Sequence, residues 1–295
     1  MKQLFQSLGV KTNQDSKGFH FYSTSKDLFT LWVACKNDSA LREAAKNADK
    51  LHRYVDDSSS NFAGITPKEL ENHASGMGID LKAFQEAKEK LKDFSSALQT
   101  NFAPIASSRK RRFSEHDGEY SYDRRNEIEP FQACVKEKSG VLNTLVLNVD
   151  FNFSAFHDAA KITKFGAFCF AIFSKLEEAG ISCEVNLRQS INGLCTSGKV
   201  KDKKTDFYIR VKEAGSYVEE SEIARCFTSG FYRRACFAFW TACAENNDSE
   251  VCSGLGFVQA LPDETQAGSI TLSFGNQTDN QEKLIAGILA AIKKG

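Results

Sequence analysis

A strand–helix–strand pattern in the second half of the chain constrains its fold more than any other feature. Residues 141–150 are dominated by Val and Leu, as expected of a strand buried on both faces. A helical pattern follows over residues 156–179 and stops at Gly180, and residues 181–187 have the pattern of a second strand. Because such a crossover joins neighbouring parallel strands with right-handed geometry, we predict a βαβ unit.

The rest of the C-terminal half extends this unit. Residues 207–212 and 268–274 have strand patterns, and apolar residues recur at helical spacing over 219–244 and from Asp279 to the end of the chain. We therefore predict that residues 132–295 form an α/β domain. Its sheet should be doubly wound and mostly parallel, of Rossmann type, with helices on both faces.

The first hundred residues have a different pattern. Residues 18–25 suggest a short strand, after which Ser25 would cap a helix with Leu28, Leu31 and Trp32 on its apolar face. Further helices are indicated over 39–56, from the start signal Thr66-Pro67-Lys68-Glu69, and over 80–99. We predict a mainly helical region over residues 1–100 and a charged connecting segment over residues 101–131.

The charge balance limits the classes of partner. The formal charge is zero, because 38 Lys and Arg residues balance 38 Asp and Glu residues. This argues against a generally cationic nucleic-acid binder, although a local basic patch stays open. No apolar run reaches the roughly 18 to 20 residues of a membrane-spanning helix, and the first residues lack the apolar core of a signal peptide. We expect a cytoplasmic protein with no membrane partner.

The common fingerprints of enzymes are missing from the sequence. It has no P-loop, no Gly-x-Gly-x-x-Gly turn after a strand, no Gly-x-Ser-x-Gly elbow and no His-Glu-x-x-His motif. The nine cysteines include no Cys-x-x-Cys pair, and several stand in apolar runs, which favours buried, reduced thiols. A catalytic cysteine beside one of the five histidines stays open. The prediction leans towards a non-enzymatic protein without a cofactor.

Short polar side chains directly follow the most buried predicted strand, in the order Asp150-Phe151-Asn152-Phe153-Ser154. Oxygen ligands at every second position suit a hard divalent cation, so Asp150, Asn152 and Ser154 are candidate ligands of Mg²⁺. The motif resembles the Asp-x-Ser-x-Ser signature of von Willebrand factor A domains, which bind Mg²⁺ at this strand end. Asn152 replaces the first Ser, and the later Thr and Asp of that family have no clear counterparts. The alternative is that these side chains cap the helix and turn.

Two further candidates lie in the connecting segment. Four consecutive bases, Arg109, Lys110, Arg111 and Arg112, could contact nucleic-acid phosphates or an acidic partner. The alternative is a solvated basic loop, neutralised by the acids that follow it. His116, Asp117 and Glu119 could bind a metal or act in acid–base chemistry. A turn built on Asp117-Gly118 explains the same residues.

Several motifs from Arg112 onwards occur in a distinctive order. They are an Asp-Gly before a later Pro (Asp117 to Pro130), a strand ending in small polar residues (Leu147 to Ser154), a Gly-Ala helix leading to Glu-x-x-Gly (Gly166 to Gly180) and paired Arg before an aromatic run (Arg233 to Trp240). This order resembles a family of uncharacterised proteins from bacteriophages and actinobacterial elements. The resemblance implies a phage or mobile-element origin and a fold like a degenerate von Willebrand A domain. The family brings no known activity.

The expected function is that of a non-enzymatic, phage-type protein of the host cytoplasm that acts through protein–protein interaction. By analogy, its partner would be a host defence factor or an AAA+ ATPase of the kind that works with von Willebrand A proteins. One alternative is a metal-dependent enzyme or metal-gated binder that uses Asp150, Asn152 and Ser154. A second alternative is nucleic-acid binding through Arg109–Arg112. The oligomeric state is not indicated.

Overall fold

The computed structural model describes residues 7–8, 10–14, 18–43, 48–56, 62–74, 79, 81–91, 109–114, 119–120, 131–136, 144–153, 157–192, 194–195, 204–246, 250–251, 268–274, 286–288 and 290–291. For residues 109–136 it describes the backbone of the strands but not the side chains. Ser154, His116, Asp117 and Gly118 lie outside the described residues.

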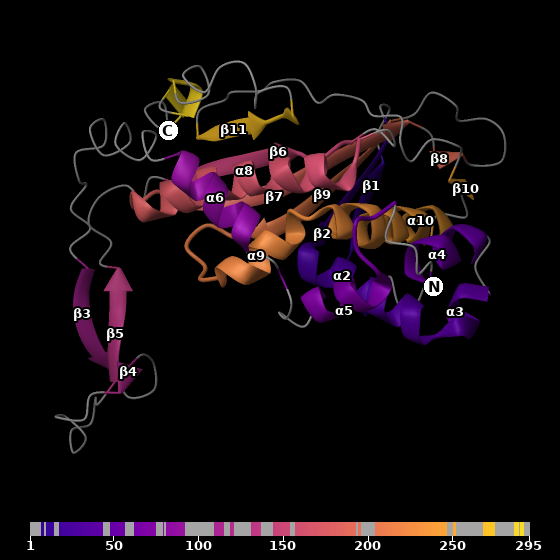
Figure 1. Ribbon diagram of the computed structural model, residues 1–295, viewed down its shortest axis with the longest axis horizontal. Helices are drawn as coiled ribbons and strands as arrows, with labels where there is room; N and C mark the ends of the chain where they lie inside the picture. Colours follow the sequence, from indigo (N-terminus) through magenta and orange to yellow (C-terminus); the bar gives the residue numbers. More distant parts are fainter. Residues whose placement is uncertain are drawn as a thin grey trace.

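A six-stranded mixed sheet forms the centre of the molecule (Figure 1). Its strands occur in the order β1 (Lys11–Gln14), β2 (Gly18–Thr24), β9 (Lys204–Lys212), β7 (Ser182–Asn192), β6 (Thr144–Asp150) and β11 (Ser269–Leu272). The pairs β2/β9, β7/β6 and β6/β11 are parallel, and the pairs β1/β2 and β9/β7 are antiparallel. The predicted α/β class is therefore confirmed, and most of the strand pairs are parallel.

Strand β9 runs opposite to β7, although we expected a mostly parallel sheet. The reason is local, because β7 and β9 follow one another as the arms of a hairpin that pairs Asn192 with Lys204. Among the described residues between them no helix is present, and only a crossover brings consecutive strands back in parallel. By contrast, helix α8 (Ala159–Glu178) stands between β6 and β7, and these strands are parallel, as predicted for a βαβ unit.

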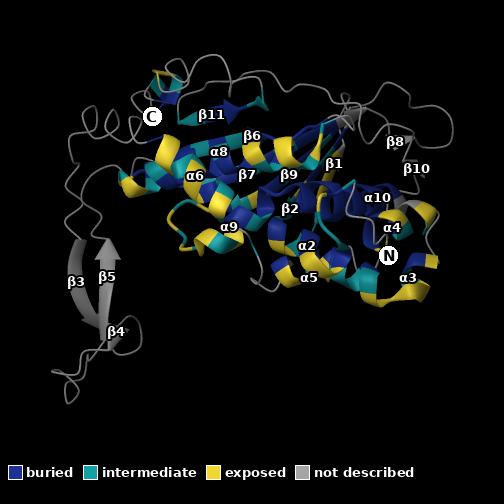
Figure 2. Cartoon of the chain, viewed as in Figure 1, coloured by how far each residue is buried: buried dark blue, intermediate teal, exposed yellow. Residues whose placement is uncertain are grey.

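The main described helices lie on one face of the sheet (Figure 1), where we expected helices on both faces. They are α2 (Ser25–Asn37), α3 (Ser39–Glu43), α4 (Ala48–Val55), α5 (Pro67–Ala74), α6 (Lys82–Lys90), α8, α9 (Glu220–Cys226), the π-helix η2 (Phe231–Cys236) and α10 (Phe237–Asn246). Phe207 of β9 contacts Trp240 of α10, with ring centroids 5.5 Å apart. Figure 2 shows that outer helices such as α6 and α9 expose one side, whereas α10 is coloured as buried.

Side chains alternate between the two faces of the sheet, as the pleat requires. Phe21, Phe207, Leu187 and Val149 lie on the face beneath the helices and are buried. The intervening positions are mostly polar, and many are half-buried or exposed. This alternation is typical of a sheet with one face packed on a core.

The N-terminal elements join this same sheet. Strand β2 and helix α2 match the predicted strand and helix, but the cap is Thr24 rather than Ser25. The Thr24 hydroxyl accepts a bond from the Asp27 amide at 3.2 Å, and the Asp27 carboxylate accepts one from the Thr24 amide at 3.1 Å. Because β2 pairs with β9, residues 18–24 and 204–210 share one sheet. The division of the chain at residues 100 and 131 stays a prediction.

The predicted helix over residues 219–244 is interrupted. It consists of α9, a break at Phe227 and Thr228, and then η2 and α10. The Thr228 hydroxyl accepts a bond from the Phe231 amide at 3.2 Å, so the second segment has a polar start. Two short sheets complete the described strands: β3 (Arg109–Ser114), β5 (Phe131–Lys136) and β4 (Glu119–Tyr120) in one, β8 (Leu194–Cys195) and β10 (Glu250–Val251) in the other. Among the described helices, none is long and apolar enough for a bilayer.

Candidate functional site

The Asp150 motif lies at the carboxyl end of β6, as predicted. Its side chains are buried, with Asp150 6% and Asn152 8% exposed. The Asn152 amide nitrogen donates to Asp150 Oδ1 at 2.5 Å, and its amide oxygen accepts from the Ser190 backbone amide at 2.8 Å. Asn152 therefore bridges the end of β6 to β7.

This arrangement allows a test of the predicted Mg²⁺ site. One carboxylate oxygen and the amide oxygen of Asn152 already accept internal hydrogen bonds. Within the described part of the chain, no group of three or more His, Cys, Asp or Glu side chains is placed to hold a metal ion. Mg²⁺ is commonly held by one or two carboxylates together with several waters, and Asp150 is the carboxylate that the motif supplies. Ser154 lies outside the described residues, so the full motif stays a prediction.

The π-helix η2 holds the segment that follows Asp150. The Tyr232 hydroxyl accepts a bond from the Phe153 amide and donates one to the Phe153 carbonyl, both at 2.9 Å. Burial raises the pKa of Tyr232, which keeps its hydroxyl proton in place for this donation. The irregular helix and the strand end therefore form one buried polar unit.

The paired arginines predicted before an aromatic run lie in this helix and are almost completely buried. Arg233 donates to the carbonyls of Phe62 and His157. Arg234 donates to the carbonyls of Ile65 at 3.0 Å and Tyr54 at 3.4 Å. Three of these carbonyls belong to Tyr54, Phe62 and Ile65, so the pair fastens this part of the N-terminal region to η2.

A second region is open to solvent. A cleft of about 1010 Å³ separates the start of α2 from the end of β9 and the start of α9. A second hollow of about 400 Å³ lies over the polar face of the sheet, beside Lys11, Tyr22 and Tyr208. Thr24 and Arg210 line both hollows. We call the two together the Arg210 groove.

A tight turn forms one rim of the Arg210 groove. Residues 213–216 make the turn, with Gly215 at φ +78°, and Tyr217 follows with 89% of its surface exposed. The Gly215 amide donates to Ser182 Oγ at 2.7 Å, and the Ser216 hydroxyl donates to the Glu213 carbonyl at 2.7 Å. Tyr217 is therefore presented from a turn whose backbone is tied to the sheet.

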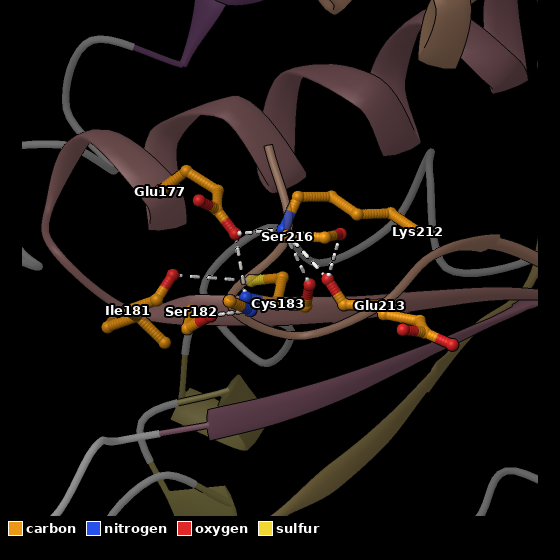
Figure 3. A network of polar contacts seen from close by, with 8 residues as sticks. Glu177, Ile181, Ser182, Cys183, Lys212, Glu213 and Ser216 are labelled. Carbon is orange, nitrogen blue, oxygen red and sulfur yellow. Dashed lines mark hydrogen bonds and ion pairs between the residues drawn. The ribbon is translucent and has the colours of Figure 1, made fainter. Parts of the chain in front are cut away.

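An ion pair between the buried Lys212 and the partly buried Glu177 supports this turn (Figure 3). Lys212 is 4% exposed, and its Nζ lies 3.1 Å from Glu177 Oε1 of α8. The same Nζ donates to the carbonyls of Cys183 at 3.1 Å and Glu213 at 3.2 Å, while Glu177 Oε1 accepts from the Cys183 amide at 2.7 Å. Because every partner in this network is itself bonded, the ion pair fixes the turn, α8 and β7 to one another.

A row of side chains crosses five neighbouring strands on the polar face. In register order it runs from Lys11 through Tyr22, Tyr208 and Arg188 to Asp150. The Tyr22 and Tyr208 rings stack with centroids 4.9 Å apart, and the Arg188 guanidinium lies 5.1 Å from the Tyr208 centroid. Burial raises the pKa of Tyr208, and the charge of Arg188 opposes that rise. The row connects the Asp150 motif to the Arg210 groove.

The remaining predicted residues are placed only in part. Arg109, Lys110, Arg111 and Arg112 lie on β3, whose side chains are outside the described residues, and Glu119 begins β4. Six cysteines have described side chains, and these are buried and free, as expected: Cys35, Cys169, Cys183, Cys226, Cys236 and Cys243. Burial raises the pKa of Cys35 and of Cys226 to about 11, so their thiols stay protonated at neutral pH.

Thr24, Arg210 and Tyr217 were not among the residues predicted from the sequence. Thr24 and Arg210 meet only because β2 pairs with β9, a long-range contact that no local pattern indicates. Tyr217 had a usable signal, since a large aromatic side chain in a Gly- and Ser-containing polar turn has little apolar surface nearby to cover it.

Comparisons with known proteins identify one family. No curated protein and no solved structure matches the chain. A family model described as a domain of unknown function, DUF7192, matches residues 19–295, from the second residue of β2 to the end of the chain. The match includes η2, the Asp150 motif and the Arg210 groove apart from Lys11. The chain therefore belongs to the DUF7192 family.

Proposed function

We propose that this protein is a non-enzymatic binding module that acts through protein–protein interaction, with the Arg210 groove as its contact surface. The observation that carries the proposal is Tyr217, which is 89% exposed and stands on a hydrogen-bonded turn at the rim of the groove. Tyr and Arg are the side chains that most often dominate the binding energy of protein interfaces.

The rigidity of the turn favours binding over a passive surface role. A partner that contacts Tyr217 would not have to order the backbone beneath it, because the Lys212–Glu177 network already does so. Pre-organisation of this kind reduces the entropy lost on association. Arg210 and Glu213 form an exposed ion pair with a distance of 2.8 Å. Such surface ion pairs contribute little free energy, so a partner could replace this one at little cost.

A fold like a degenerate von Willebrand A domain is part of the proposal. It is supported by the position of Asp150 at the end of β6, which has β7 on one side and β11 on the other. In open α/β sheets this switch point is where ligands bind. A phage or mobile-element origin, a cytoplasmic setting, and a host defence factor or AAA+ ATPase as partner belong to the same proposal.

Site-specific crosslinking in cells that express the protein tests this function. A photoreactive phenylalanine analogue at position 217 should give a discrete crosslinked product with another protein. The Arg210→Glu variant should abolish that product. The control carries the analogue at Lys161, an exposed position near the start of α8, whereas Glu177, which supports the turn, lies near the end of that helix. Equal products from positions 217 and 161, or no product at 217, would contradict the proposal.

A metal-dependent role is the second candidate, favoured by the place of Asp150 at the switch point. Titration of the purified protein with Mg²⁺ or Mn²⁺ in a calorimeter, with Asp150→Ala as control, tests it. Heat that disappears in the control would support a cation at Asp150, and the absence of heat in the native protein would remove the idea. Nucleic-acid binding through Arg109–Arg112 predicts salt-sensitive retardation of DNA or RNA that is lost when the four residues become Ala.

A further inference from the structure

We propose that Ser190 and Asp206 bind a monovalent metal cation, Na⁺ or K⁺, between strands β7 and β9. The two residues lie on the polar face of the sheet and are not part of the Arg210 groove. The inference goes beyond the proposed function and does not depend on it, because a cation bound to the folded state stabilises it whether or not a partner protein is present.

The register of the sheet places the two side chains next to each other. Strands β7 and β9 are neighbours (Figure 1), and Ser190 is directly paired with Asp206. Side chains of paired residues lie on the same face with Cβ atoms about 4.5–5.5 Å apart, so their oxygen atoms can both reach one ion. Each residue is two positions along its strand from Arg188 or Tyr208, which places both on the polar face.

Each of the two side chains has an oxygen atom that is buried without a partner. Ser190 is fully buried, and its hydroxyl forms no hydrogen bond within the described part of the chain. Asp206 Oδ1 is likewise shielded from solvent, and no described residue bonds it. Buried polar atoms almost always have partners, and an ion or a water molecule is a common partner where the protein supplies none.

The charge at the site favours a cation over a water molecule. Asp206 Oδ2 lies 3.5 Å from His20 Nδ1, but His20 carries a charge only when it is protonated. Among the described residues, no Lys or Arg forms an ion pair with this carboxylate. A water molecule could bond both oxygen atoms but would leave the carboxylate charge unbalanced. Buried charges in proteins are paired or bind metal ions.

The available ligands favour a monovalent over a divalent cation. Within the described residues, no group of three or more His, Cys, Asp or Glu side chains is placed to hold a metal ion. Ser190 and Asp206 offer one neutral and one charged oxygen ligand, so a single positive charge balances the site. The Asp206 side chain is 15% exposed, which leaves a path for the ion and for the waters that complete its coordination shell.

Thermal unfolding of the full-length protein at constant ionic strength tests the inference. Circular dichroism gives the Tm in NaCl, in KCl and in choline chloride, whose organic cation is too large for the site. We expect the Tm to be about 3 °C or more higher in NaCl or KCl than in choline chloride. The salt that gives the larger rise identifies the ion.

Three variants locate the effect. Asp206→Asn keeps the shape of the side chain but removes its charge, and should reduce the difference in Tm between the salts to about 1 °C or less. Ser190→Ala should reduce the difference as well, while its Tm in choline chloride should equal or exceed that of the native protein, because a buried hydroxyl without a partner is removed. Glu213→Gln, which alters an exposed carboxylate, should keep the full difference.

Two outcomes would overturn the inference. One is an equal Tm of the native protein in all three salts, which is the result expected of a buried water molecule. The other is a difference between salts that persists in Asp206→Asn and in Ser190→Ala. If Asp206→Asn does not fold, Ser190→Ala alone decides. Crosslinking at position 217 is independent of these results, so the proposed function and this inference can fail separately.

Discussion

The strand end at Asp150 and the Arg210 groove contain similar side chains but use them in opposite ways. Asn152 at the strand end and Tyr232 and Arg234 of η2 are buried, and each bonds at least one backbone group. At the groove Arg210 and Tyr217 are exposed. The described side chains of the Asp150 motif thus form hydrogen bonds within the fold, whereas the Arg210 groove, which is open to a partner, contains no sequence motif. Matched substitutions in the two regions measure this difference.

The largest difference in the loss of stability is expected between substitutions of two arginines, Arg234 and Arg210. Arg234→Met removes the donors to the Ile65 and Tyr54 carbonyls, although the Tyr54 carbonyl keeps its bond from Trp32 Nε1. We expect a loss of about 2 kcal/mol in the free energy of unfolding, since a polar group left without its partner costs about 1–3 kcal/mol. Arg210→Met should change it by about 0.5 kcal/mol or less, because exposed ion pairs contribute little. Urea denaturation of both variants checks this, and equal losses would remove the contrast.

Two tyrosines give the next comparison. Tyr232→Phe deletes one hydroxyl that makes two bonds to Phe153, and we expect a loss of about 2 kcal/mol. Tyr217→Phe deletes a hydroxyl in water and should leave stability unchanged within about 0.5 kcal/mol. Thermal unfolding followed by circular dichroism measures both. A stable Tyr232→Phe variant would mean that η2 does not hold the strand end as described.

A third comparison concerns two asparagines, Asn152 in the Asp150 motif and Asn186 on the polar face of the sheet. Asn152→Ala leaves the Ser190 amide and Asp150 Oδ1 without the partners they have now, and we expect a loss of about 2 kcal/mol. Asn186→Ala on the polar face, where the amide bonds the half-exposed Glu184, should cost about 1 kcal/mol or less. The two variants are compared by urea denaturation. If they lose the same stability, the burial of the motif has no consequence for the fold.

The smallest expected loss of stability depends on pH and involves Glu69, at the start of α5. Hydrogen bonds from Thr66 lower the pKa of Glu69 in the capping box of α5. A carboxyl whose pKa is lower in the folded state stabilises the fold above its unfolded pKa of about 4.3, and loses that contribution as the pH falls through its folded value. Glu69→Gln should therefore cost about 0.5 kcal/mol at neutral pH. The difference from the native protein should vanish in acid, as measured by urea denaturation at several pH values.

The elements that local patterns specify were predictable from the sequence. The β6–α8–β7 unit, the strand and helix around Thr24 and the capping box at Thr66 follow from apolar spacing and cap residues. The placement of β2 beside β9 was not predictable, because it depends on a contact between residues far apart in the sequence. The break between α9 and η2 was missed, since apolar residues continue through it at helical spacing.

The candidate site was predictable only where it is local. The position of Asp150 at a strand end follows from the apolar run before it, but its bond to Asn152 depends on the fold of the turn. The buried state of Arg233 and Arg234 also depends on tertiary structure, since nothing in their own segment indicates the loop carbonyls that surround them. The Arg210 groove combines residues from α2, β9 and α9, and no single segment indicates it.

The pairing of β2 with β9 has a consequence for dissecting the molecule. A fragment that starts after α6 would leave the backbone groups of residues 204–210 in β9 without the strand that now bonds them. An unpaired edge of this length, with Phe207 and Ile209 uncovered by α2, is a template for intermolecular pairing. Shortened versions made for crystallisation or spectroscopy should therefore keep residues 18–37, or they will aggregate through β9.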